Sequence, residues 1–148
     1  MIFNVGSGGA SSADKVKYDN RTSGLKATNV QGAVDEVNNR LNYSTDEQII
    51  GTWIDGKPIY RQVFVSNTTL SIDSTLKTFT IGNIQNCEKL IRVDVLINDK
   101  NDNLSVNYSL SNSGYSGYVT SDGKVNISYM NIMIKNPTCI IEYTKTTD

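Results

Sequence analysis

The feature that most constrains the fold is a series of turn-forming residues that divides the chain from Asn42 onward into short segments. The segments between the turns are rich in β-branched and aromatic residues, which favour strands. In residues 59–65, for example, Ile59, Val63 and Val65 fall on one face of an extended chain, and Tyr60, Gln62 and Phe64 on the other. The predicted strands centre on residues 49–54, 59–65, 77–81, 90–97, 104–110, 115–119, 125–134 and 139–144.

These short strands predict a mainly β fold, a β-sandwich or a jelly-roll-like domain over residues 42–148. The expected turns are at 55–56, 82–83, 98–103, 112–114, 122–123 and 136–137. Apolar residues make up 38% of the chain and charged residues 20%. Asn, Ser and Thr replace the missing apolar residues, which suits solvated strand faces and turns.

Residues 29–41 are the one segment with a helical pattern. Thr28 is the expected N-cap, and Gln31 three residues later completes a capping box. The apolar residues Val30, Val34, Val37 and Leu41 recur at intervals of four, three and four, as in a coiled coil. Because so short a helix is marginal alone, this stripe must be covered, either by the β-domain of the same chain or by other copies of the helix. β-Branched residues at both core positions favour a trimer over a dimer.

The N-terminal segment, residues 1–28, has linker composition in its first half, with Gly and Ser after Val5. The residues of this segment that could anchor it to another protein are Ile2, Phe3 and Val5. The alternative is a disordered tail. Residues 15–28 are expected to be extended, with little structure of their own. The sequence therefore divides into an anchoring segment (1–28), a coiled-coil helix (29–41) and a β-domain (42–148).

Two stretches of this sequence resemble segments of bacteriophage fibre proteins. One is Tyr18-Asp19-Asn20 together with residues 23–37, SGLKATNVQGAVDEV, which in those proteins introduces a short trimeric helix. The other is residues 50–61, IGTWIDGKPIYR, which is similar to the opening of a fibre β-domain; the first six residues also resemble the starts of such proteins. The resemblance covers roughly the first 61 residues and implies a homotrimer, attached through its N-terminus to a capsid or tail protein, with a distal β-domain. It leaves head and tail attachment both open.

Several functions are disfavoured by composition. The chain has no histidine and two cysteines, Cys87 and Cys139, so histidine-based catalysis and a conventional zinc site are excluded. We expect two buried thiols rather than a disulfide. A net charge of −1 with scattered basic residues argues against nucleic acid. No segment has the length of apolar sequence that a membrane span or a secretory signal requires. We expect no cofactor and no metal.

Candidate binding residues are few. Tyr115 and Tyr118 lie among Ser, Asn and Gly, a composition typical of adaptable recognition loops, and are the candidates for a receptor or glycan contact. Trp53, with Tyr60 and Phe64, is either a core anchor or a sugar-stacking platform. Residues 98–103 resemble a calcium loop but lack its glycine and glutamate. A catalytic carboxylate pair of Asp55 with Asp73 or Glu88 has no supporting spacing.

The sequence as a whole predicts a homotrimeric structural fibre of a phage particle, assembled in the host cytoplasm and located in the virion, and not an enzyme. Its β-domain would project for host-surface attachment. The alternative is a carbohydrate-binding adhesin module without a dedicated structural role.

Overall fold

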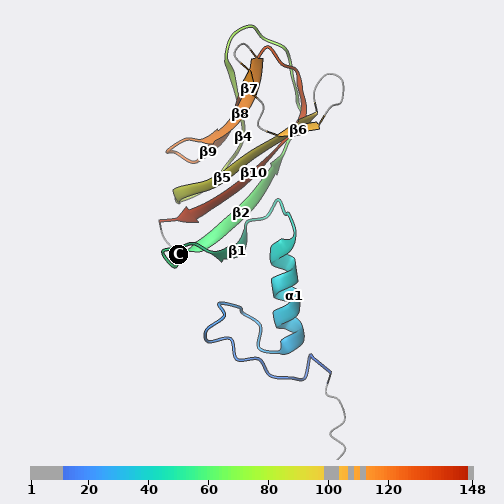
Figure 1. Ribbon diagram of the computed structural model, residues 1–148, viewed down its shortest axis with the longest axis vertical. Helices are drawn as coiled ribbons and strands as arrows, with labels where there is room; N and C mark the ends of the chain where they lie inside the picture. The colour runs from blue at the N-terminus through green and yellow to red at the C-terminus, as the bar shows by residue number, and fades with distance from the viewer. Residues whose placement is uncertain (1–11, 99–103, 107–108, 111–112, 147–148) are drawn as a thin grey trace, which may run out of the picture. The chain divides into compact units, whose positions relative to one another are not determined.

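The structure is a computed structural model that describes residues 12–98, 104–106, 109–110 and 113–146 (Figure 1). It is mainly β, with one short helix. The chain forms two compact units, residues 1–42 and 43–148. The first contains the helix α1 (Val30–Leu41), and the second contains all the described strands.

Helix α1 begins one residue later than the sequence predicts. The N-cap is Asn29 and not Thr28: the Asn29 side chain accepts a 2.7 Å hydrogen bond from the Gly32 N–H. The predicted capping box is wrong for the same reason, and the Gln31 amide instead donates to Asp35, 2.9 Å away, one turn along the helix. Asparagine serves as well as threonine at this position, so the residue types alone left the boundary open by one residue.

The strands of the second unit form two antiparallel sheets. The six-stranded sheet has the order β1-β2-β10-β5-β6, with β3 also paired to β10, and the four-stranded sheet has the order β4-β9-β8-β7 (Figure 1). The bounds are β1 (Gln48–Thr52), β2 (Pro58–Val65), β3 (Thr69–Leu70), β4 (Lys77–Asn83), β5 (Cys87–Asn98), β6 (Leu104–Val106), β7 (Ser109–Leu110), β8 (Ser113–Val119), β9 (Lys124–Met130) and β10 (Ile134–Lys145).

The two sheets share one apolar core. Alternation along each strand sends every second side chain into it, as in β10, where Cys139, Ile141 and Tyr143 are all fully buried. The other members of the core are Leu70, Ile84, Val95, Ile97, Tyr115, Val125, Ile127 and Ile134. The sheets approach so closely that a Cβ on Gly117 of β8 would lie 2.4 Å from Val93 Cγ1 of β5.

Strands from the two ends of this unit lie side by side. β2 pairs with β10 in one sheet, and β4 pairs with β9 in the other. Because the last strand, β10, lies between β2 and β5, the six-stranded sheet is complete only when the end of the chain has been made. Other pairs join neighbours in the sequence: β1 joins β2 through a turn at Gly56 (φ 89°), and β8 joins β9 through one at Gly123 (φ 85°).

Three predicted turns are wrong. Asn136-Pro137 lies inside β10, where the register shifts between Lys135 and Thr138; Asn136 has φ 47° there. A bulge can hold a proline inside a sheet because the missing N–H is not needed by the neighbouring strand. Gly82-Asn83 ends β4, and β8 already begins at Ser113, so the expected turns at 82–83 and 112–114 are displaced.

The strand expected over residues 104–110 is divided in the structure between β6 and β7, which belong to different sheets. The strand expected over 125–134 ends at Met130, and Asn131 has φ 53°. The short β3 was not expected at all. Each difference occurs where the chain passes between layers, which periodicity within one strand does not reveal.

Candidate functional site

The predicted trimer seam lies on one face of α1. Val34, Val37 and Leu41 are 59%, 50% and 72% exposed, and Val30 is half-buried. Much of the apolar face of this 12-residue helix is therefore unburied in the single chain, although a helix gains stability mainly from burial of such a face.

The adjacent face of the same helix is covered by the segment that precedes it. Ala33 is buried, and the Glu36 carboxylate accepts hydrogen bonds from the backbone N–H groups of Lys26 and Ala27, at 2.9 and 3.1 Å. Arg40 donates to the Gly24 carbonyl (3.2 Å) and to Glu36 (3.3 Å). Although partial burial acts to raise the pKa of Glu36, these donors outweigh it and hold the pKa below its ordinary value.

Residues 12–28 are therefore more ordered than the sequence predicts. The Tyr18 N–H donates to the Thr28 carbonyl, the Val30 N–H donates to the Val16 carbonyl, and Lys17 forms a β-bridge with Asn29. This explains why the SGLKAT stretch, Glu36 and Arg40 occur together: the loop binds one side of the helix and leaves the apolar stripe, about a quarter turn away, open.

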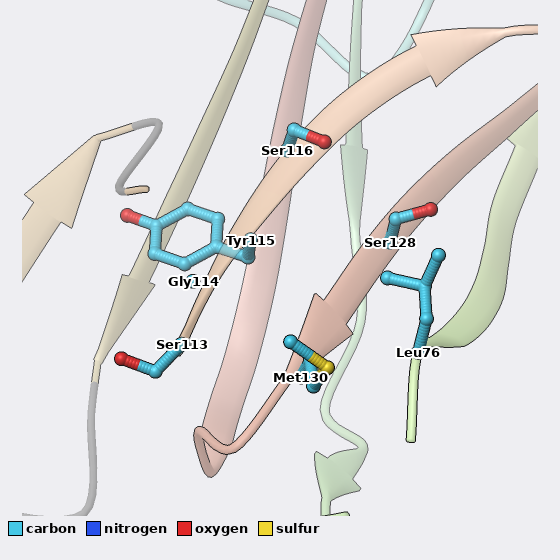
Figure 2. Close-up of a pocket in the computed structure, with 7 residues that line it drawn as sticks. All are labelled: Leu76, Ser113, Gly114, Tyr115, Ser116, Ser128 and Met130. Carbon is cyan, nitrogen blue, oxygen red and sulfur yellow. The ribbon is translucent and has the colours of Figure 1, made fainter. Parts of the chain in front are cut away.

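The two candidate receptor tyrosines are in different environments. Tyr115 is 3% exposed and belongs to the core, whereas Tyr118 is 36% exposed on the outer face of the four-stranded sheet. Figure 2 shows Tyr115 and Ser116 leaving β8 on opposite sides, beside a small cavity of about 160 Å³. The Tyr118 hydroxyl is 3.5 Å from that of Thr78 on β4. Of the two rings, Tyr118 is the one open to solvent.

Trp53, Asp55 and Glu88 lie in or beside the β1–β2 turn, whereas Asp73 lies in the segment between β3 and β4. The Lys89 ammonium lies 5.7 Å from the centre of the half-buried Trp53 ring and 3.7 Å from Asp55. Glu88 pairs with Lys57, and Asp73 pairs with Lys77 at 3.4 Å. Hydrogen bonds from Thr75, and more weakly the Lys77 ammonium, lower the pKa of Asp73. Each of the three carboxylates thus pairs with its own lysine.

The cysteines are both free, as expected, but only Cys139 is buried, and Cys87 is half-buried. They lie on the paired strands β5 and β10, but Cys87 is opposite Lys145 and Cys139 is opposite Val95. Eight residues of strand, about 26 Å, separate these two positions, far beyond the roughly 4–7 Å between Cα atoms that a disulfide spans. Burial raises the pKa of the Cys139 thiol to about 12.

Other candidates lie outside the part of the chain that can be described. These are the anchoring residues Ile2, Phe3 and Val5, and most of the calcium-like loop at 98–103. Among the described residues there is no cluster of three or more potential metal ligands, and α1 is too short and too polar to cross a membrane.

Sequence reasoning missed one group of residues altogether, on the outer face of the six-stranded sheet. Tyr43, Arg61, Arg92, Asp94 and Glu142 gather there from four separate segments. An indication was present in the sequence, because Arg92 and Asp94 alternate with Val93 and Val95 and so had to share a face opposite the core. The cross-strand partners were not predictable without the register.

Comparison with protein-family models, curated proteins and solved structures gives no match to this chain.

Proposed function

We propose that the chain is a structural fibre of a bacteriophage particle, a homotrimer held together by α1 and not an enzyme. The observation that carries the proposal is the apolar stripe Val34/Val37/Leu41, which is more than half exposed over most of its length while the adjacent helix face is bound by the chain's own loop. The resemblance of residues 18–20, 23–37 and 50–61 to segments of phage fibre proteins supports the same assignment.

The energy available from this stripe is sufficient for association. Complete burial of a valine or leucine side chain contributes about 1.5–3 kcal/mol, so burying what is still exposed would contribute roughly 3–5 kcal/mol per chain. Three helices would share this surface, with β-branched residues in both core positions favouring three strands. Burial of the stripe would also offset the low intrinsic stability of a 12-residue helix.

In the proposed fibre, residues 1–5 dock on a capsid or tail protein, and the β-domain projects from the particle. The pairing of early strands with late ones, β2 with β10 and β4 with β9, supports a jelly-roll-related topology for this domain. A carbohydrate-binding adhesin is the second candidate function, and a groove on the β-domain, described below, favours it. The two functions are compatible in one molecule.

The solution mass of the full chain tests the trimer. Light scattering at micromolar concentration should give about three times 16.3 kDa. The double variant Val34→Asp/Val37→Asp should be monomeric, because each buried charge costs several kcal/mol in an apolar seam. The matched control Asn38→Asp/Asn39→Asp adds two charges to exposed positions of the same helix and should remain trimeric. A monomeric parent protein, or a trimeric seam variant, would refute the proposal.

A further inference from the structure

The outer face of the six-stranded sheet carries a groove of about 500 Å³. Its volume lies within the roughly 300–1,000 Å³ of small-ligand sites. The groove is lined by residues of the three central strands and of the segment before β1, namely Tyr43, Val63, Arg92, Asp94, Leu96, Thr138 and Ile140. It therefore lies on the face opposite the core, over β2, β10 and β5.

The register arranges these residues in rows that cross the three strands. One row is charged and consists of Arg61, Glu142 and Arg92. The next two rows are mostly apolar and form the floor, Val63–Ile140–Asp94 and Val65–Thr138–Leu96. The Cβ atoms of residues directly opposite one another on paired strands lie about 4.5–5.5 Å apart, so the side chains within each row are in contact across the strands.

The charges of the groove are balanced and partly buried. Arg61 and Glu142 approach to 3.9 Å with side chains only 10% and 14% exposed. Asp94 is 17% exposed and pairs with Arg92, whose side chain is half exposed at the rim. Two arginines thus match two carboxylates, so the groove offers both donors and acceptors without a net charge.

Tyr43 forms an aromatic wall beside this row. Its ring is held by the Arg61 guanidinium, 4.3 Å from the ring centre, yet the residue remains 59% exposed. A tyrosine that is fixed on one side and open to solvent is a rigid contact surface with little conformational entropy to lose.

We propose that this groove binds an uncharged glycan, with Tyr43 against a sugar ring and Arg92 and Asp94 bonded to its hydroxyl groups. A hydroxyl both donates and accepts, which matches alternating arginines and carboxylates, whereas a groove without net charge offers no excess of cations to attract an acidic sugar. The floor of the groove consists of side chains on the face of the sheet, where β10 is paired with both β2 and β5, so an extended peptide lying in it would not add as a strand. The inference rests on the host-attachment role proposed for the β-domain, but not on the trimer.

The test is binding of the full-length protein to an array of neutral oligosaccharides of hexoses and N-acetylhexosamines, with sialylated and sulphated oligosaccharides beside them. The parent protein should bind neutral members. Tyr43→Ala and the near-isosteric Asp94→Asn should each weaken binding about tenfold or more, since each removes one principal contact. Tyr118→Ala is the matched control, because it removes a half-exposed tyrosine from the other sheet, and it should leave binding unchanged.

Three results would overturn the inference: no binding by the parent protein, a preference for acidic sugars, or binding that depends on Tyr118 and survives both groove variants. Light scattering on the same samples keeps the two proposals apart. A trimer that binds no sugar leaves the fibre intact and eliminates the glycan site. If Leu96→Lys lowers the mass of the assembly and no glycan binds, the groove is a contact between copies of the chain.

Discussion

The hydrogen bonds from the 24–27 loop to Glu36 allow a quantitative prediction for the variant Glu36→Gln. The parent carboxylate accepts two backbone N–H groups and the Arg40 guanidinium, with a side chain that is 27% exposed. A hydrogen bond to a charged group contributes about 1.5–3 kcal/mol, roughly twice a neutral one. Glutamine keeps one acceptor oxygen and loses the charge, and partial exposure reduces the effect, so we expect a loss of about 1–2 kcal/mol.

Amide hydrogen exchange measured by NMR reports this loss at the affected groups. The amides of Lys26 and Ala27 should exchange about tenfold faster in Glu36→Gln, because each 1.4 kcal/mol of opening free energy is a factor of ten. The Tyr18 amide, bonded to Thr28 in the same loop, should follow. Amides of the β-domain should be unaffected, since they belong to the other compact unit.

The control is Asp35→Asn on the same helix. Its carboxylate accepts from the Gln31 side chain, so the same chemical change should leave the loop amides as they are in the parent. Equal acceleration in both variants would mean that helix charge, and not the Glu36 contact, orders the loop. Unchanged exchange in Glu36→Gln would refute the reasoning directly.

Three further predictions follow from the same geometry. Because the folded-state pKa of Glu36 is lowered, the contribution of its carboxylate to stability is complete above the ordinary value near 4.5 and is lost as the pH falls through the folded-state pKa. The amides of the loop that it binds should therefore lose protection from exchange below about pH 4.5. Protection that is constant to about pH 3 would contradict this. Gly117→Val should destabilise the β-domain by about 1–3 kcal/mol in urea unfolding, because the added methyl groups meet Val95 of the facing sheet; an unchanged midpoint would mean that the sheets can separate at no cost. Iodoacetamide should modify Cys87 well before the buried Cys139, read by mass spectrometry with a denatured control, and equal rates would contradict the packing of the core.

Local signals predicted much of this molecule. The positions of α1 and of most strands follow from periodicity and turn residues, since both depend on neighbours close in sequence. The prediction was least accurate where tertiary contacts override local preference. Asn136-Pro137 has the composition of a turn but lies in a bulge of β10, because the strand is held on both sides by β2 and β5.

The apolar stripe of α1, Val30, Val34, Val37 and Leu41, could be identified from spacing alone, because a helix fixes which side chains share a face. The role of Glu36 could not, since it depends on a loop ten residues away folding back onto the helix. The groove is the extreme case. Tyr43, Arg61, Arg92 and Glu142 are far apart in the sequence, and only the pairing of β2, β10 and β5 brings them to one face.

The sequence by itself determined the elements and their apolar faces, because helical and strand periodicities are properties of consecutive residues. The tertiary structure decided which faces are covered. Non-local strand pairing set the register, buried Tyr115 and left Tyr118 open, and placed Arg61 over Tyr43 beside a groove that no stretch of the chain contains by itself.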